Sequence, residues 1–238
     1  MKRGKKFKVY SLPSKQTDTM IAANLLTDSL IPLRTSDTGD DALSVMGDFY
    51  VKHLPIVNNE ELLGLISEED ILDNDAMEAV GSYPLSLARY YVRDTDHIYE
   101  VMRLLAEYRL TVIPVVDDQS KYLGMISQED LINYFAATGA FTEPGSIIVL
   151  EMHRRDYSLA EIARIAESEN ANIVSSFISS GLDGSLIDVT LKINLQSIQA
   201  LLATFDRFGY QVKASFNESD YFDTLKERYD SLMMFLNV

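Results

Sequence analysis

The chain has 238 residues, of which 47% are hydrophobic and 24% are charged, so it has enough apolar side chains to bury a substantial core. Its formal net charge of −15 opposes binding to a nucleic-acid backbone, and no apolar run approaches the roughly 20 residues that cross a bilayer. With no cysteine and no secretory leader pattern, we expect a cytoplasmic protein with neither a nucleic-acid nor a membrane partner.

Residues 1–16 form a basic N-terminal tail, which we interpret as a solvated chain end. Behind this tail a unit of about sixty residues occurs twice, over residues 17–75 and 76–139. Arg34 aligns with Arg93 at an offset of 59 residues, and this offset rises to 60 after a surface turn. One inserted turn residue is a change that a duplicated module tolerates.

Each copy predicts the same elements in the order β-α-β-β-α. A short extended segment precedes a helix, two apolar strands follow around a polar turn, and a second helix begins at a Ser-x-x-Asp sequence. Pro55 and Pro114 lie in the first of the two apolar strands, where we expect a strand start or a sheet edge. The expected first segments and first helices are 31–34 and 90–93, followed by 41–50 and 98–108.

The second strand of each copy ends in the same phrase, GLISEED at residues 64–70 and GMISQED at residues 124–130. A serine at a helix N-terminus lies beside unpaired amides and the positive end of the helix dipole, which suits a phosphate group. An aspartate one turn later can accept two hydrogen bonds from ribose hydroxyls. The same spacing is also typical of a capping box, in which the serine and the acid satisfy each other's amides. The residues leave both interpretations open.

The duplicated element order, the LPIV and IPVV strands and the two heptapeptides resemble a tandem pair of CBS domains over residues 17–139. The resemblance implies a mixed α/β fold in which the copies pack sheet to sheet around two clefts. Some such clefts bind AMP, ADP, ATP or another adenosyl ligand, so an adenine nucleotide is the expected ligand. Carried over to this chain, the resemblance implicates the serine, the aspartate and one strand residue of each copy, which are Ser67, Asp70, Ile56, Ser127, Asp130 and Val115.

Arg34 and Arg93 are the expected counter-charges for a phosphate, because they are equivalent in the two copies and follow the first extended segments. The planar guanidinium group is well suited to phosphate oxygens. An ion pair with the nearby Asp37 or Asp96 is the alternative role for these arginines.

Residues 146–216 predict the order β-α-β-β-α-β, the split βαβ arrangement of ferredoxin-like folds. With AEIARIAESENANI at residues 160–173, this segment resembles an ACT domain, which implies amino-acid binding or pairing between copies. The family's Asp-Arg-Pro-Gly loop is replaced by residues 154–157, with a tyrosine where the glycine is expected, so we favour self-association as a homodimer. A CBS pair followed by an ACT-like module is similar in layout to acetoin-utilisation accessory proteins.

Residues 217–238 carry the apolar stripe of an amphipathic helix, which we expect to pack on its own chain or on a second subunit. No catalytic or metal-binding motif is recognisable, so we predict no enzyme, no required cofactor and no metal. Two hypotheses remain. In the first, an adenine nucleotide in the clefts regulates an unidentified protein; in the second, the chain is a dimerisation adaptor with empty clefts.

Overall fold

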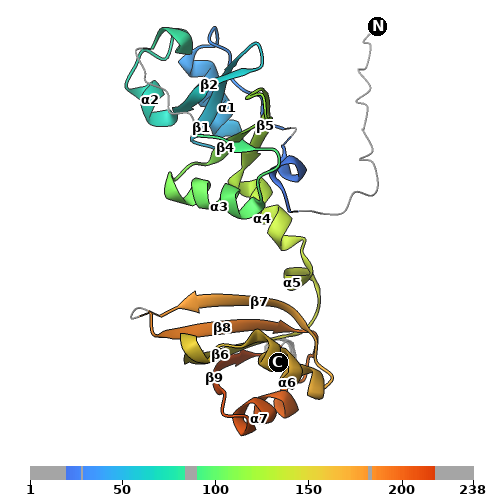
Figure 1. Cartoon of the computed structure of the whole chain (residues 1–238). Helices are drawn as coiled ribbons and strands as arrows, with labels where there is room; N and C mark the ends of the chain where they lie inside the picture. The colour runs from blue at the N-terminus through green and yellow to red at the C-terminus, as the bar shows by residue number, and fades with distance from the viewer. Residues whose placement is uncertain (1–19, 28, 84–89, 182–183, 218–238) are drawn as a thin grey trace, which may run out of the picture. The chain divides into compact units, whose positions relative to one another are not determined.

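The computed structural model describes residues 20–27, 29–83, 90–181 and 184–217. The basic tail expected at residues 1–16 lies outside this range, as does the helix expected at 217–238 apart from Asn217. The chain divides into two compact units, residues 1–134 and 135–238 (Figure 1). None of the helices within the described ranges is long and apolar enough to cross a membrane.

The first copy of the repeat is built around an antiparallel hairpin of β1 and β2. Its expected first strand is reduced to a single parallel bridge between Leu33 and Ile56. The elements of this copy are the 3₁₀ helix η1 (Ala22–Leu25), α1 (Gly39–Asp48), β1 (His53–Asn58), β2 (Glu61–Ser67) and α2 (Glu68–Leu72). The 3₁₀ helix η2 (Val80–Ser82) belongs to the start of the second copy.

The second copy shows the predicted β-α-β-β-α order in full. Its three strands lie in the order β3-β4-β5, with β3 parallel to β4 and β4 antiparallel to β5. The elements are β3 (Val92–Arg93), α3 (Ile98–Glu107), β4 (Val112–Val116), β5 (Tyr122–Ser127) and α4 (Gln128–Ala136).

The glycine that opens each heptapeptide has a backbone function. Gly64 pairs with Ile56 and Gly124 pairs with Val115, and in each hairpin the register shifts directly after that pair. The φ angles of the two glycines are +157° and +159°, which side-chain-bearing residues rarely adopt. At Gly124 a Cβ atom would also lie 3.1 Å from Leu26 Cδ2. The bulge in each hairpin therefore accounts for both glycines.

The expected position of the prolines is wrong for Pro114, which is the third residue of the central strand β4. The equivalent Pro55 shows why the proline is tolerated: its carbonyl accepts the Leu33 amide at 2.8 Å. A residue in a strand directs its amide and carbonyl to the same edge. The missing amide of Pro55 therefore faces the segment around Leu33, which pairs with β1 only through a single bridge.

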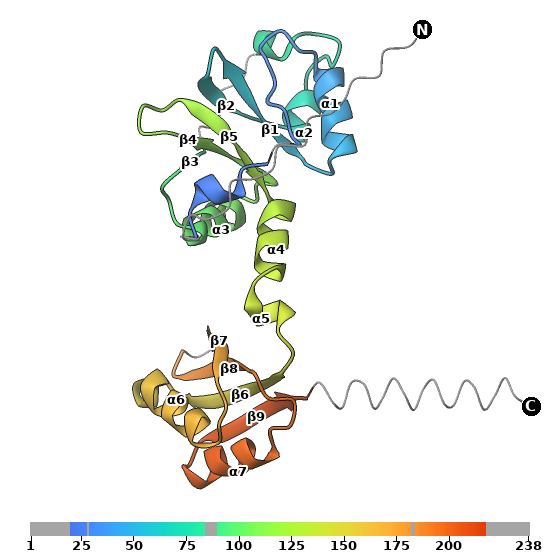
Figure 2. The ribbon, with the colours of Figure 1, turned by 90° about the vertical axis from the view of Figure 1, so that its right-hand side faces the viewer.

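The segment that precedes each copy packs against the other copy. Two amides of η1 donate to the carbonyls of Asp94 and Asp96, at 3.0 and 2.8 Å. Two amides of η2 donate in the equivalent way to the carbonyls of Thr35 and Asp37, at 3.0 and 2.8 Å. η1 consequently lies beside α3 and α4 of the second copy, although in sequence order it belongs to the first copy (Figures 1 and 2).

The hairpins of the two copies meet near their turns. The Tyr122 amide donates to the Glu60 carbonyl at 2.7 Å, and the Glu60 carboxylate pairs with Lys121 at 3.0 Å. Together with the exchanged segments, these bonds join the two copies into one unit.

The second unit has a four-stranded antiparallel sheet in the order β7-β8-β6-β9, which follows from the observed β-α-β-β-α-β element order. α6 and α7 cover one face of the sheet, where Ile162, Leu201 and Phe205 join the buried side chains of β6 and β8. The elements are α5 (Gly139–Thr142), β6 (Ser146–His153), the 3₁₀ helix η3 (Arg154–Asp156), α6 (Leu159–Ser168), β7 (Ile173–Ser180), β8 (Leu186–Ile193), α7 (Gln199–Arg207) and β9 (Gln211–Phe216).

Candidate functional site

Ser127 and Asp130 form a capping box at the N-terminus of α4. The Asp130 amide donates to Ser127 Oγ at 3.0 Å, while the Ser127 amide and hydroxyl donate to Asp130 Oδ2 at 2.9 and 2.5 Å. Ser127 is buried and Asp130 is partly buried. Oδ2 is therefore committed to the helix cap, whereas Oδ1 takes no part in it.

Ser67 and Asp70 repeat this arrangement at the N-terminus of α2. The Asp70 amide donates to Ser67 Oγ at 3.1 Å, and the Ser67 amide and hydroxyl donate to Asp70 Oδ2 at 2.9 and 2.6 Å. Both heptapeptides are thus helix caps, as one of the two interpretations expects. A cap of this kind leaves the second carboxylate oxygen for a ligand, so it does not exclude a ribose contact.

Backbone bonds also occupy part of each helix N-terminus. The Gln128 amide donates to the Thr111 carbonyl at 3.0 Å, and the Glu68 amide donates to the Lys52 carbonyl at 2.9 Å. In α4 this bond and the capping box use the first and third amides, so the Glu129 amide is the one that they leave. The α4 terminus therefore offers a phosphate fewer donors than an uncapped helix would.

A pocket of about 640 Å³ lies beside Ser127 and Asp130. Four segments build it: the residues after η1, the loop between α1 and β1, Thr111 directly before β4, and the end of β5 with the first turns of α4. Its volume is within the range of small-molecule sites, and its wall combines apolar side chains with hydroxyl, amide and carboxylate groups. We call it the Ser127 pocket, and its lining residues are Thr27, Ser29, Leu30, Phe49, Tyr50, Val51, Thr111, Ser127, Gln128, Glu129, Asp130, Ile132 and Asn133.

Most of this lining was missed by reasoning from the sequence. The residues after η1 belong to the first copy in sequence order, but the exchanged segment carries them onto the second copy. Tyr50 follows α1 with a φ of +54°, and Arg109 follows α3 with a φ of +53°. The two residues are equivalent in the repeat and share this uncommon backbone conformation.

Arg34 and Arg93 do not join the serines. Arg34 lines a separate pocket of about 490 Å³ beside the β1–β2 turn, and the Arg93 guanidinium pairs with Asp118 at 3.2 Å. The arginine amides donate to Asp37 and Asp96, so the expected local acids bind the backbone and not the guanidinium groups. The hairpin turns lie at the opposite ends of β2 and β5 from the serines, about 17–20 Å away at the usual rise per residue.

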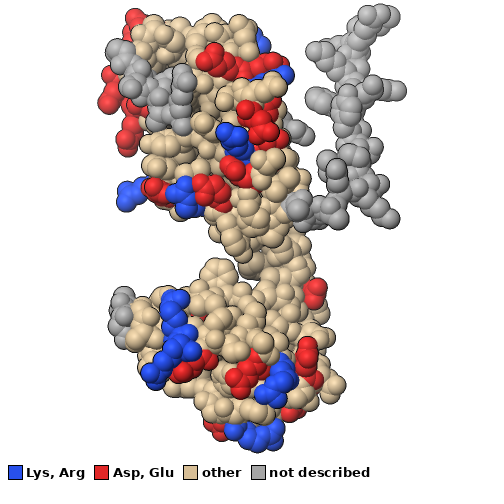
Figure 3. Space-filling view, in the orientation of Figure 1, with Lys and Arg blue, Asp and Glu red and all other residues tan. Residues whose placement is uncertain are grey.

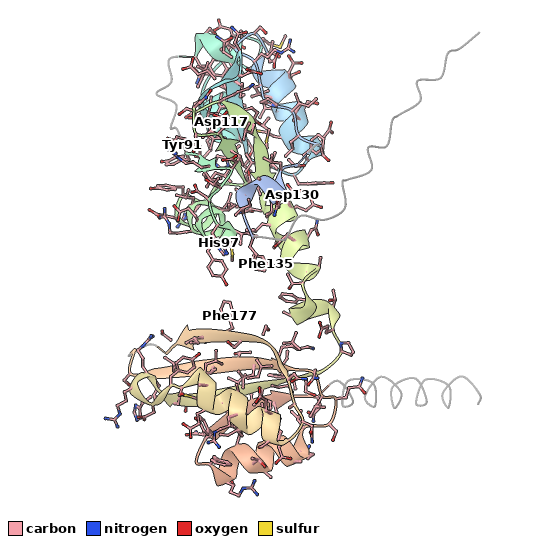
Figure 4. The ribbon with its side chains drawn as sticks, turned by 45° about the vertical axis from the view of Figure 1, so that its right-hand side comes forward. Tyr91, His97, Asp117, Asp130, Phe135 and Phe177 are labelled. Carbon is pink, nitrogen blue, oxygen red and sulfur yellow. The ribbon has the colours of Figure 1, made fainter. Side chains whose placement is uncertain are left out.

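Figure 4 shows the same separation for two labelled acids, Asp117 at the β4–β5 turn and Asp130 at the start of α4. A phosphate held at the serine of one copy would therefore not reach the predicted arginine of that copy.

Ile56 and Val115 are also absent from the Ser127 pocket lining. Their exposed fractions are 1% and 0%, because each lies between a bridge or strand on one side and a hairpin partner on the other. The apolar wall of the pocket comes instead from Leu30, Val51 and Ile132.

The cleft at Ser67 has a different lining by repeat position. Lys52 occupies the position equivalent to Thr111, and Arg109 occupies the position equivalent to Tyr50. The counterparts of Thr27–Leu30 fall within residues 84–89, which are outside the described ranges. Lys52 forms an exposed ion pair at 3.6 Å with Glu68, the first residue of α2.

The family model for the CBS domain matches residues 22–76 and 87–137. This chain contains a tandem pair of CBS domains. Among curated proteins, this chain is 28% identical over 120 residues to a homoserine O-acetyltransferase of Methanococcus vannielii, covering 48% of this chain and 24% of that protein. It is 26% identical over 122 residues to the magnesium transporter MgtE of Thermus thermophilus, covering 49% of this chain and 27% of the transporter. The chain therefore spans about a quarter of each of these relatives.

Solved structures with a similar CBS pair include a CBS domain pair/ACT domain protein from Thermotoga maritima and CBSX2 in complex with AMP. The first is 23% identical, with 49% of this chain and 96% of that chain covered and a TM-score of 0.44. The second is 24% identical, with 48% and 95% covered and a TM-score of 0.42.

Acidic and basic side chains of the CBS pair lie next to one another on the face shown in Figure 3. On that face the lysines and arginines do not gather into a basic patch of the kind that duplex binding requires (Figure 3).

His53 links the two CBS domains at the start of β1. Its Nδ1 accepts the Thr111 amide at 3.3 Å and lies 3.1 Å from Thr111 Oγ1, so the ring proton belongs on Nε2. Burial lowers the pKa of His53, although the carboxylates of Asp70 and Glu69 act in the opposite direction. The folded CBS pair therefore favours the neutral ring.

We expect the CBS pair to lose stability as the pH falls below the unfolded histidine pKa of about 6.5. Because the folded pKa is lower, the unfolded chain binds the proton first, and the loss continues until the pH passes the folded pKa. Urea unfolding between pH 7.5 and 5 measures this effect. His53→Gln should show a shallower decrease than the parent chain, and equal decreases in the two would contradict the assignment.

Proposed function

We propose that this chain is a non-catalytic regulatory protein that binds an adenine nucleotide or another adenosyl ligand in the Ser127 pocket. The observation that carries the proposal is the combination of this pocket with the free Oδ1 of Asp130 at its wall. A carboxylate oxygen accepts hydrogen bonds from the two hydroxyls of a ribose, and the apolar side chains of Leu30, Val51 and Ile132 offer a surface for the base.

We assign the ribose contact to Asp130. The side-chain hydroxyls of Ser127 and Thr111 are assigned to the surroundings of the ligand's 5′ position. Asp70 and Ser67 have the same capping geometry and remain the candidates for a second cleft. Arg34, Arg93, Ile56 and Val115 have no part in this proposal, because the Ser127 pocket does not include them.

The second unit is proposed to be an ACT-like domain that mediates self-association or an effector response. Its β-α-β-β-α-β order and its one-sided helical cover support this assignment. Phe177 is 72% exposed and projects from β7, where it pairs with Thr190 of β8. Its side chain lies on the sheet face opposite α6 and α7 (Figure 4). We propose that Phe177 marks the contact surface of this domain. We expect a homodimer, with twice the chain mass of 26.8 kDa in light scattering; a monomer would contradict the proposed self-association.

A thermal-shift panel of AMP, ADP, ATP and adenosine tests the ligand proposal. A ligand that binds only the folded state stabilises it, by about 2.7 kcal/mol at one hundred times its Kd. We expect at least one of these compounds to raise the melting temperature of the CBS pair by several degrees at millimolar concentration. No shift with any of them would support the adaptor with empty clefts instead.

A further inference from the structure

The charges around the Ser127 pocket are of one sign. None of the described residues that line it is a lysine, arginine or histidine, whereas Glu129 and Asp130 both contribute carboxylates. The remaining polar groups are neutral hydroxyls and amides, and Gln128 Nε2 already donates to the Leu110 carbonyl at 2.9 Å. At the start of α4, the backbone bonds and the capping box therefore leave an anion the amide of Glu129, beside two negative charges.

The nearby cations that the structure describes are committed or belong to the other cleft. Lys52 pairs with Glu68, and Arg109 occupies in the second CBS domain the position that Tyr50 occupies beside this pocket. Arg34 and Arg93 lie at the far ends of the hairpins. Among the described residues, a phosphate in the Ser127 pocket would consequently meet carboxylates and no lysine or arginine of the pocket wall.

We infer that the Ser127 pocket selects an adenosine ligand whose 5′ substituent is neutral or positively charged, and that it disfavours phosphorylated nucleotides. This inference rests on the proposed function and narrows it to a ligand class. Two like charges several ångströms apart near a protein surface repel each other enough to weaken binding by roughly tenfold. Glu129 is the specificity residue, because it is exposed and stands outside the capping box that ties up Asp130 Oδ2.

Three probes of similar size separate charge from shape: 5′-amino-5′-deoxyadenosine, adenosine and AMP. Calorimetric titration of the full chain at low salt, with a chelator to remove divalent cations, gives their Kd values. We expect the amine to bind most tightly, adenosine next, and AMP at least tenfold more weakly than adenosine. The difference should shrink at 0.5 M salt, because salt screens the repulsion.

Two variants at matched positions of the repeat make the test specific. Glu129→Lys should reduce the adenosine preference over AMP by tenfold or more, and Glu129→Gln should reduce it by a smaller factor. Glu69→Lys introduces the same charge at the other cleft and should leave the preference unchanged. Replacing the basic residues of the N-terminal tail by glutamine should also leave it unchanged. These residues are Lys2, Arg3, Lys5, Lys6 and Lys8.

The outcomes distinguish this inference from the proposed function. If none of the three probes binds, and ATP with added magnesium does not bind either, the ligand proposal fails, and the charge selection fails with it. If AMP binds more tightly than adenosine and Asp130→Ala abolishes that binding, the charge selection is wrong while the proposed function stands. The same conclusion follows if ATP binds only with added magnesium and adenosine does not bind, because the carboxylates would then hold a metal-bridged phosphate.

Discussion

Replacing Asp130 by alanine is expected to weaken binding of an adenosine ligand by about a hundredfold, because two hydrogen bonds to a charged oxygen are lost. Asp70→Ala is the matched control, since it removes the same capping box from α2. Each substitution should lower stability by about 1 kcal/mol through the lost cap. Calorimetric titration measures binding, and urea unfolding measures stability.

The two variants should therefore resemble each other in stability and differ in affinity. Similar affinity losses in both would mean that the ligand occupies both clefts or that the caps act only through folding. Full affinity in Asp130→Ala would remove the ribose contact from the account.

Phe205→Ala is expected to destabilise the second unit by about 3–5 kcal/mol, because it empties a fully buried aromatic site. The Phe205 ring lies in the core between the sheet and α7, with the Tyr210 ring 5.8 Å away. Hydrogen exchange followed by mass spectrometry can assign the effect to a segment, because local opening is reported peptide by peptide. Residues 146–216 should exchange faster, while peptides from the CBS pair keep their protection.

Phe208→Ala provides the control for this substitution. Phe208 is 46% exposed and follows α7, so its loss should cost less than about 1 kcal/mol. The ligand should bind Phe205→Ala as tightly as the parent chain, since the Ser127 pocket is lined from the first unit alone. Faster exchange in the CBS pair of Phe205→Ala would contradict the division into two units.

The repeat could be predicted from the sequence because residues that set the local backbone conformation recur at equivalent positions of the two copies. The bulge in each hairpin has a backbone conformation that favours glycine, so Gly64 and Gly124 recur, and a helix start favours Ser-x-x-Asp, so the capping boxes recur. The element order of residues 146–216 followed from the same kind of periodicity. These features depend on residues that are close in the chain.

The composition of the site could not be predicted in the same way, because it depends on contacts between distant residues. Nothing local indicates that η1 bonds to the carbonyls of Asp94 and Asp96, yet that exchange brings Thr27 to the pocket. The arginines were expected near the serines because they are equivalent in the two copies and follow the first extended segments. The length of the hairpins instead places Arg34 at the opposite end of its sheet from Ser67.

The most direct test of the ligand site is a crystal structure of the full chain grown with adenosine. We expect one nucleoside per Ser127 pocket, with the ribose hydroxyls within hydrogen-bond distance of Asp130 Oδ1 and the base against Leu30, Val51 or Ile132. A nucleoside bound instead beside Arg34 at the β1–β2 turn, or a Ser127 pocket filled only by water at saturating adenosine, would contradict it.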